Sequence, residues 1–473
     1  MKRGKSVLKC ICFIAIFAVL FVYVQEVLRD KWADGEYNPS TKIKGFYAEE
    51  KNSLEVVFIG SSQVYADIAP AVLFHDYGIT SYDFCANEQP IWISYYYIKE
   101  VLKHQDPKVI VLDVFTVYGA DYEAEGVTHF SLDDLPMSFN KIEAINASVP
   151  PGERYAYYFP IAKYHNTWVD LSQRKTELAF YHEKDPYKGY SPFVFAAEYA
   201  ESAKPEVVMQ TECEPIPDRA LLWLNQIVDL CEEEGVDLLL TKTPNGHAER
   251  QKLYNSVAAF AQERDIPFYN MNVLADGQAH VNVIQAEKIS QMMGDYLVAH
   301  YDLEDYREDP AYLSWHEDAQ LFYRQKAKCE LISAATFEEY VTCLQDAGYV
   351  VCISAKNSRN IFFDSEKIKY LNDVLGVNCH LDTMTQDGYA VILDGGNVIA
   401  EGAQINESID MLDIHITSPA GGLSDMSSNI YINGTDFSMD VDGFNIVVYD
   451  KLLGEVFEMA AFDANNEMTL LRK

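Results

Sequence analysis

The chain has 473 residues, of which 49% are hydrophobic and 13% aromatic, so it is too long for one ordinary core and too apolar for a disordered chain. Its formal net charge of -35 argues against nucleic acid, or an anionic lipid surface, as a partner of the soluble part. Neutral or cationic glycans remain compatible with this charge. The length predicts two or three domains.

The amino terminus predicts a membrane anchor. Four basic residues, Lys2, Arg3, Lys5 and Lys9, precede an uncharged apolar run that ends at Val24. No small-x-small cleavage site follows directly, so we favour an uncleaved signal anchor over residues 1–30 rather than a cleaved signal peptide. The chain would then cross the cell membrane once, with its bulk outside the cytoplasm. Residues 31–53 are polar and suit a tether.

The nine cysteines leave two interpretations open. Their number is odd, and the soluble part has no C-x-x-C pair and no His-Cys spacing typical of a zinc site. The four late ones are Cys329, Cys343, Cys352 and Cys379. They could form disulfides in an exported protein, or they could be buried free thiols.

After the tether, short apolar segments alternate with a helical pattern. The predicted elements are a strand at 54–59, a strand at 79–84, a helix at 93–104 and a strand at 109–114. Strands that alternate with helices in this way predict a parallel sheet with right-handed crossovers. The fold class is therefore α/β.

The pattern breaks from about 118 to 217, where Tyr, Phe, His and Pro are frequent, and it returns afterwards. We interpret the break as an insertion over the carboxyl edge of the sheet, where aromatic loops could stack on sugar rings or form a small core of their own. The returning elements are a helix from 218, a strand at 237–240, a helix at 248–264, a strand at 266–269 and a helix at 283–300.

The last third of the chain has a different character. Residues 306–328 are charged and predict a linking helix. From 329 to 473, short strands are separated by Gly and Asn turns such as Gly395-Gly396 and Asn433-Gly434, and the stretch 337–346 is the one clear helix. These features predict a separate, mostly β domain.

Three residues could form a nucleophilic site. Ser62 follows the first strand, and Asp276 and His280 follow the last strand of the α/β domain. Because the ends of parallel strands open onto one crevice, His280 could take a proton from Ser62 while Asp276 holds the imidazole. Taken alone, Gly60-Ser61-Ser62 is also a common turn composition.

A resemblance to a known family adds to this interpretation. The run from Val57 to Ser62 resembles the first block of the SGNH/GDSL hydrolase superfamily. Bacterial cell-surface members are also similar around 87–90, 107–113, 242–244 and 280–282. The resemblance covers roughly 54–300 and implies a flavodoxin-like three-layer α/β/α domain over 31–305. It implies Ser62 as nucleophile, His280 as base, and no metal or organic cofactor.

The chain departs from the family pattern at three points. Ser61 stands where the family has Asp. The Gly-x-Asn-Asp block is not recognisable, so Asn87 and Gln89 are the candidates for polar contacts to an oxyanion. The carboxylate normally lies three residues before the histidine, whereas Asp276 lies four before His280.

The carboxy-terminal domain has a resemblance of its own. The stretches 349–356, 388–392, 418–422 and 443–450, and the final block that ends at 463, resemble the interleukin-like EMT inducer (ILEI/PANDER) domain. This resemblance implies a small β-sandwich-like fold that binds carbohydrate or mediates adhesion. A structural spacer is the alternative.

Together these observations predict a membrane-anchored serine esterase or O-acyltransferase of the SGNH type. It would act on acyl groups, acetyl above all, of cell-wall or surface glycans. The alternative is a catalytically inactive surface protein that binds glycans or supports assembly and uses the α/β domain as a scaffold. The sequence does not indicate an oligomeric state.

Overall fold

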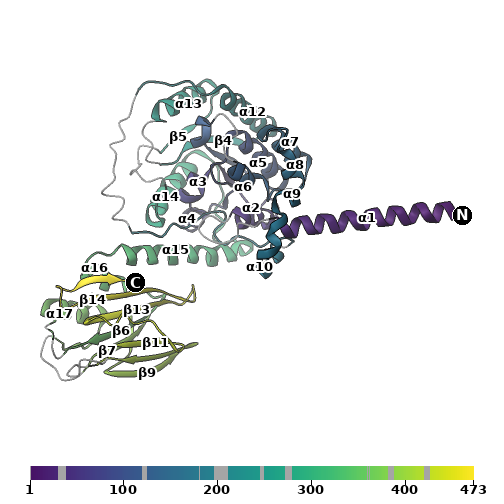
Figure 1. Cartoon of the computed structure of the whole chain (residues 1–473). Coiled ribbons are helices and arrows are strands. Elements are labelled where there is room, and N and C mark those ends of the chain that lie inside the picture. The colour runs from purple at the N-terminus through teal and green to yellow at the C-terminus, as the bar shows by residue number, and fades with distance from the viewer. Residues whose placement is uncertain are drawn as a thin grey trace. The chain divides into compact units, whose positions relative to one another are not determined.

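The computed structural model describes residues 2–29, 39–119, 125–180, 182–196, 211–244, 250–271, 280–358, 361, 363–381, 388–419 and 427–473. It divides into two compact units, shown in Figure 1. Unit 1 comprises Met1–Phe193 and Tyr199–Phe322. Unit 2 comprises Val194–Glu198 and Tyr323–Lys473.

Unit 1 is built on a parallel sheet of five strands in the order β2-β1-β3-β4-β5. The strands are β1 (Val56–Ile59), β2 (Ser81–Asp83), β3 (Val109–Asp113), β4 (Asp237–Lys242) and β5 (Phe268–Asn270). Each residue of β1 and β3 is buried, as expected for parallel strands that are covered on both faces. The predicted α/β fold class is confirmed, and the strand order is the flavodoxin-like one.

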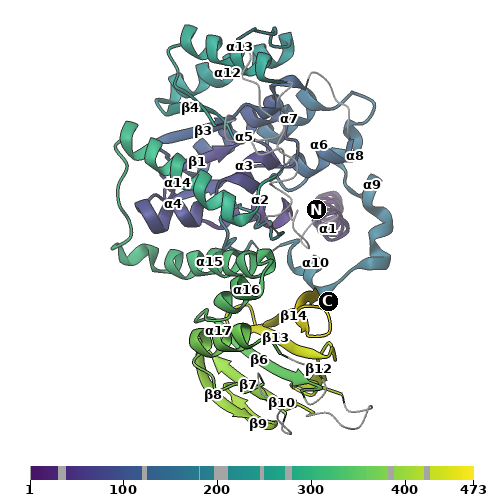
Figure 2. The same ribbon diagram turned by 90° about the vertical axis from the view of Figure 1, so that its left-hand side faces the viewer.

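Helices cover the two faces of this sheet, as Figure 2 shows. The main core joins Val57, Ile59 and Ile110 to the apolar sides of α5 and α12. On the other face α14 packs against α3 and α4. The bounds are α3 (Ser62–Asp67), α4 (Pro70–Tyr77), α5 (Ile91–His104), η1 (Phe115–Tyr118), α12 (Asp218–Glu234), α13 (Gln251–Glu263) and α14 (Val283–His300).

Most of the described insertion is helical, which differs from the expected loops over the carboxyl edge. Its elements are α6 (Glu125–Leu132), α7 (Phe139–Ser148), α8 (Arg154–Tyr158), α9 (Ile161–Tyr164), η2 (His165–Asp170) and α10 (Gln173–Glu177). Helix α7 packs on α5. Leu132 of α6, Ile145 of α7 and Tyr157 of α8 extend the main core on this side. The aromatic content of the segment therefore serves packing in part.

The tether prediction for 31–53 is wrong for its second half. Residues 39–48 form helix α2 (Pro39–Ala48), whose Ile43 and Phe46 are fully buried. Its lysines are buried too, because Lys42 Nζ donates to the Tyr190 carbonyl at 2.8 Å and Lys44 Nζ donates to the Leu178 carbonyl. Polar composition alone does not show that these side chains have partners inside the fold.

The predicted linking helix is α15 (Leu313–Ser333), which begins later than expected and also belongs to a core. Trp315 is buried in unit 1, where its ring lies 5.3 Å from that of Phe74. The helix continues past the boundary between Phe322 and Tyr323 into unit 2.

Unit 2 contains two antiparallel sheets and two helices. A six-stranded sheet has the order β15-β14-β13-β6-β7-β8, and a four-stranded sheet has the order β12-β11-β10-β9. The strands are β6 (Tyr349–Lys356), β7 (Ala390–Asp394), β8 (Asn397–Gly402), β9 (Gln404–Ile409), β10 (Leu412–Thr417), β11 (Asn429–Ile432), β12 (Thr435–Asp436), β13 (Gly443–Asp450), β14 (Glu455–Asp463) and β15 (Thr469–Arg472).

Alternation along the strands gives unit 2 three layers. Val350 and Cys352 of β6 face the four-stranded sheet, whereas Val351 and Ile353 face helices α16 (Phe337–Cys343) and α17 (Ser365–Leu375). The expectation of a mostly β domain with packed sheets is confirmed. The statement that 337–346 is the one clear helix is wrong, since α17 covers the same face.

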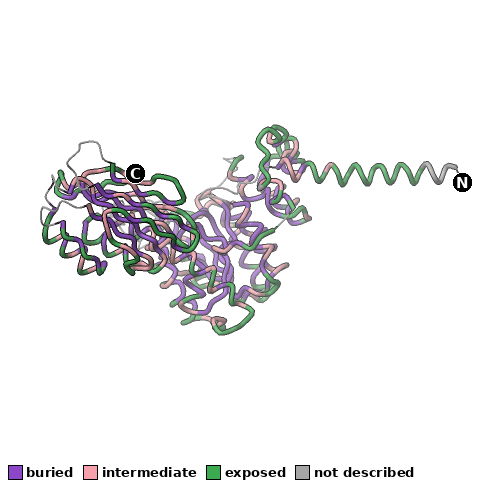
Figure 3. Tube along the Cα trace, turned by 90° about the horizontal axis from the view of Figure 1, so that it is seen from below, coloured by how far each residue is buried: buried purple, intermediate pink, exposed green. Residues whose placement is uncertain are grey.

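Helix α1 (Lys2–Leu28) projects from unit 1, and Figure 3 shows it exposed over most of its length, although Gln25 near its end is buried. Its segment Val7–Leu28 has a mean hydropathy of 2.8 and is long and apolar enough to cross a membrane. All nine cysteines lie within the described residues, and no disulfide joins any two of them.

Candidate functional site

Ser62 lies just beyond the carboxyl end of strand β1. In a sheet of this order a crevice forms outside the carboxyl ends of β1 and β3, where the strand order reverses. Strand β1 ends at Ile59, and Ser62 is the first residue of α3. Ser61 caps this helix, since its Oγ accepts a hydrogen bond from the Gln63 N–H at 3.4 Å. The turn from strand to helix thus fixes the backbone of Ser62, which is only 4% exposed.

The turn depends on the small size of Gly60. A Cβ added at this position would lie 2.7 Å from Val64 Cγ2 and 3.0 Å from Asp113 Cβ. These atoms belong to the packed junction of α3 and β3, so neither can move away at low cost.

We expect Gly60→Ala to lower the free energy of unfolding by about 1–3 kcal/mol, because the added methyl group overfills this junction. Chemical denaturation of the full chain in detergent measures the change. Gly126→Ala is the matched control, since a Cβ there meets no atom within 4 Å. Equal destabilisation by the two variants would contradict the close packing at Gly60.

His280 reaches the same end of the sheet from the far side of unit 1. It lies just before α14, whose first turn is held by a capping box between Asn282 and Gln285. Gln63 Nε2 lies 3.4 Å from His280 Nδ1 although 217 positions separate the two residues. The ring of Phe193 stacks on the imidazole at 5.3 Å. The fold therefore brings the neighbour of Ser62 into contact with His280.

The surroundings of His280 favour its neutral form. Burial lowers the pKa of the imidazole to about 4. No hydrogen bond joins Ser62 to His280, both of which the structure describes. The Gln63 amide can present its oxygen or its nitrogen to Nδ1. With the oxygen toward the ring it accepts Nδ1–H and leaves Nε2 unprotonated, the tautomer that a general base needs.

The other predicted site residues have different outcomes. Asp276 lies outside the described residues. Asn87 is half-buried in the turn that follows β2. Gln89 is buried, and its Nε2 donates to Ser94 Oγ of α5 at 3.0 Å. One N–H of the Gln89 amide thus holds α5, and its role at an oxyanion stays a prediction.

A buried ionisable cluster beside the site was missed from the sequence. It consists of Asp67, Asp113, Lys242 and Thr243. Asp113 Oδ2 accepts hydrogen bonds from the Thr243 N–H at 2.9 Å and from its hydroxyl at 3.2 Å. Lys242 Nζ donates to the Thr243 carbonyl, and burial lowers the pKa of its ammonium against the opposing attraction of Asp113 and Asp67.

Asp67 connects this cluster to the histidine segment. It is fully buried near the Thr243 side chain and the Val281 backbone, and burial raises the pKa of its carboxyl well above the usual range. Asp113 is the last residue of β3, and Lys242 is the last residue of β4. A charged residue at the end of an apolar strand is the sequence signal that could have identified both. The cluster thus links the ends of β3 and β4 to the end of α3.

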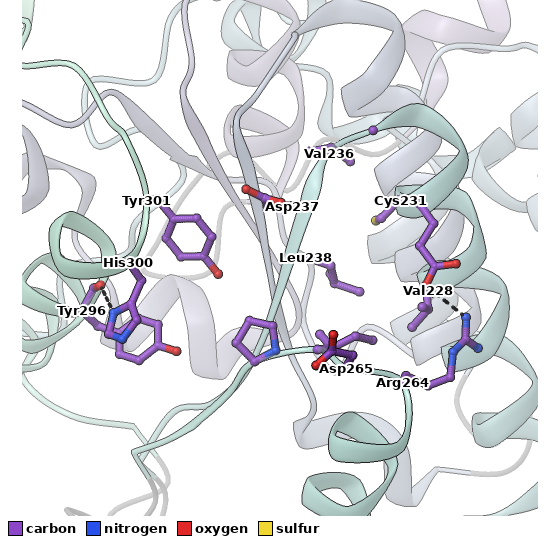
Figure 4. Close-up of a pocket in the computed structure, with 14 residues that line it drawn as sticks. Val228, Cys231, Val236, Asp237, Leu238, Arg264, Asp265, Tyr296, His300 and Tyr301 are labelled. Atoms are coloured by element: carbon purple, nitrogen blue, oxygen red, sulfur yellow. Dashed lines mark hydrogen bonds and ion pairs between the residues drawn. The ribbon is translucent and has the colours of Figure 1, made fainter.

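A separate pocket of about 610 Å³ lies at the opposite end of the sheet, shown in Figure 4. It is bordered by the residues that precede β4 and β5, including Val236 and Asp265, and by Tyr296 and His300 of α14. Since these are the amino ends of the strands, the pocket is distinct from the Ser62 end. Among the described residues no group of three His, Cys, Asp or Glu side chains could hold a metal ion.

Comparison with solved structures finds partial similarity. One is described as a lipolytic protein of the G-D-S-L family from Desulfitobacterium hafniense, with 10% identity, a TM-score of 0.26, and coverage of 51% of this chain and 98% of the other. Another is described as an acylhydrolase from Bacteroides fragilis, with 12% identity, a TM-score of 0.25, and coverage of 56% and 98%. No family model matches the chain, and no curated protein is significantly similar to it. Function is therefore inferred from the residues of the site and their geometry.

Proposed function

We propose that the chain is a membrane-anchored serine hydrolase or acyltransferase of the SGNH type that acts outside the cytoplasm on acyl esters of surface glycans. The observation that carries this proposal is the contact between Gln63 and His280 at the carboxyl end of β1. It places a histidine, made neutral by burial, against the residue next to a serine at the mouth of the expected crevice.

In the proposed reaction Ser62 Oγ attacks the ester carbonyl carbon while His280 Nε2 takes the hydroxyl proton. The tetrahedral oxyanion collapses, the bond to the sugar oxygen breaks, and His280 returns the proton to that oxygen. An acyl group now esterifies Ser62. Water or a second sugar hydroxyl attacks this ester, again deprotonated by His280, and releases acetate or the transferred acetyl ester. Asp276 or Gln63 would hold Nδ1.

The acyl-enzyme gives the direct test. The full chain in detergent is mixed with p-nitrophenyl acetate, quenched in acid and digested for mass spectrometry. We expect an acetyl group on the peptide that contains Ser62, and release of acetate from O-acetylated glycans with the native substrate. An unmodified Ser62 peptide, with no turnover above that of the heat-denatured chain, would reject the hydrolase.

The second candidate is a glycan-binding protein without catalysis. It is favoured by the absence of a hydrogen bond between Ser62 and His280 and by the two packed antiparallel sheets of unit 2, which we propose as an ILEI-like carbohydrate module. Retention of acetylated glycans by the full chain without acetate release is the result expected for this candidate.

The pH dependence of the proposed hydrolase follows from His280. Since its pKa is lowered to about 4, the neutral base is present above that pH, and kcat/KM for p-nitrophenyl acetate should rise with a midpoint near 4 rather than near 6.5. Between about pH 4 and pH 6.5 this histidine binds a proton in the unfolded chain but not in the folded one. The free energy of unfolding therefore falls as the pH drops from about 6.5 to 4. A kinetic midpoint at or above 6.5 would contradict a buried His280 base.

A further inference from the structure

A stretch of unit 1 that contacts the end of α1 exposes many apolar side chains. The described part of unit 1 has twelve exposed large apolar side chains outside α1, and only four of them, Leu222, Met292, Val298 and Leu313, lie elsewhere. The remaining eight fall within one short stretch of the insertion. They are Met137, Phe139, Tyr155, Phe159, Trp168, Val169, Leu171 and Phe180. These eight residues are called here the α7–α10 face.

Contacts place two residues of this face beside the end of α1. The Tyr23 ring stacks on Phe180 at 4.8 Å, and the Phe21 ring lies 6.4 Å from Phe159. Helices α9 and η2 contact α1, and the Thr167 hydroxyl donates to the Leu28 carbonyl. In Figure 1, α1 projects from the side of unit 1 that carries α8, α9 and α10, and Figure 2 shows it end-on between α9 and α10.

The length of the free part of α1 sets the depth of this face. From Val7 to Val24 the helix rises about 27 Å at 1.5 Å per residue, close to the hydrocarbon thickness of about 30 Å. Phe21 and Tyr23 therefore reach the outer boundary of the hydrocarbon when α1 spans a bilayer. Their partners Phe159 and Phe180 must then lie at the same level.

Polarity changes at the same height. A cavity of about 440 Å³ at this junction is lined by Phe21, Val22 and Phe159, and also by Glu26, Arg29 and Lys44. Phe21 and Val22 belong to the part of α1 toward its free end, whereas Glu26 lies in the last turn of α1 and Arg29 directly follows it. A step from apolar to charged side chains, with aromatic residues between, is typical of a membrane–water boundary.

Charge indicates what kind of surface is contacted. Lys163 of α9 is paired with Glu125 and Lys175 of α10 with Asp170, so these two lysines add no net positive charge. A chain of net charge -35 gains nothing from an anionic surface. The contact is apolar and aromatic, which suits zwitterionic lipid.

We propose that the α7–α10 face lies on the outer surface of the bilayer that α1 spans, with Phe159, Trp168 and Val169 inserted at the level of the lipid headgroups and upper acyl chains. The anchor then holds unit 1 in a fixed orientation relative to the bilayer and does not act as a flexible tether. The inference rests on the proposed anchor and is independent of the proposed chemistry.

Trp168 reports the contact, because it is 65% exposed, whereas Trp92 and Trp315 are buried and Trp223 is half-buried against Tyr95 and Tyr96. The full chain with Trp32→Phe, which removes a tryptophan outside the described residues, is reconstituted at high dilution into phosphatidylcholine vesicles. Lipids brominated on the upper acyl chain should quench most of the Trp168 emission, and iodide should quench little of it. The further change Trp168→Phe should abolish the loss of fluorescence caused by the brominated lipid.

The matched control carries Trp32→Phe, Trp168→Phe and Val298→Trp, which moves the reporter to an exposed position on α14. This tryptophan should remain open to iodide and unaffected by brominated lipid. Iodide quenching of Trp168 equal to that of the control tryptophan would overturn the inference. Protection from iodide that disappears on dilution would also overturn it, because a second copy of the chain would then cover the face. Failure of the chain to float with the vesicles would reject the anchor itself.

Discussion

Ser62→Ala should reduce kcat for p-nitrophenyl acetate by about 10⁴-fold or more, because removal of a serine nucleophile leaves only the contribution of binding and of the oxyanion contacts. Folding should be little affected, since Ser62 makes no described hydrogen bond that the change would break. Initial rates of the purified full chain in detergent, followed at the absorbance of nitrophenolate, give the comparison.

Ser61→Ala is the matched control for this experiment. Ser61 has a similar hydroxyl one position away, but that hydroxyl caps α3. Its loss should cost about 0.5–2 kcal/mol of stability and keep most of the activity. Equal rates for wild type and Ser62→Ala would reject Ser62 as the nucleophile, and equal losses in the two variants would mean that the turn alone matters.

Arg29→Ala should lower the free energy of unfolding by about 3–5 kcal/mol, since it leaves a buried carboxylate without its main partner. Arg29 Nη1 lies 2.6 Å from Asp134 Oδ1, and both side chains are almost completely buried. Burial opposes the ionisation of Asp134, but the charges of Arg29 and Lys44 outweigh it and lower the pKa of the carboxyl to about 2. The stabilising contribution of Asp134 is therefore complete above pH 3.8 and is lost as the pH falls toward 2.

Denaturation of the full chain in detergent measures this effect. The double variant Arg29→Met/Asp134→Leu should recover most of the loss, because two apolar side chains need no partner in this position. Lys99→Ala, which breaks the more exposed pair of Lys99 with Glu143, should cost less than about 1 kcal/mol. If Arg29→Ala costs no more than Lys99→Ala, the junction between α1 and unit 1 does not depend on the buried pair.

The strands and helices that were predicted well carry a strong local signal. Strand β3 is a continuous apolar run from Val109 to Leu112, as strands buried on both faces are. Helix α14 shows its full helical period from Val283 to His300. Helix α17 was missed although Ile368, Leu371 and Leu375 have helical spacing, because polar residues dominate the segment. The burial of Lys42 and Lys44 could not be predicted, since carbonyl groups from distant segments make it possible.

The candidate site was predictable in the same partial way. Ser62 follows an apolar strand and His280 precedes a clear helix, so sequence order and the rule for parallel sheets locate both at one edge. The contact of Gln63 with His280 depends on the path of the backbone at Gly60 and on the cap of α14, which no local pattern specifies. Asp67 was not noticed because a lone carboxylate in a short helix carries no signal before its neighbours are known.

The separation of Gln63 and His280 by 217 positions has a consequence for folding. Contacts between distant parts of the chain form late, because the loop between them must close first, and parallel sheets consist of such contacts. An intermediate that contains only β1, β2 and β3 would have much of the helix of unit 1 and no site. During refolding from denaturant, recovery of the proposed esterase activity should therefore follow recovery of helical circular dichroism with a measurable delay.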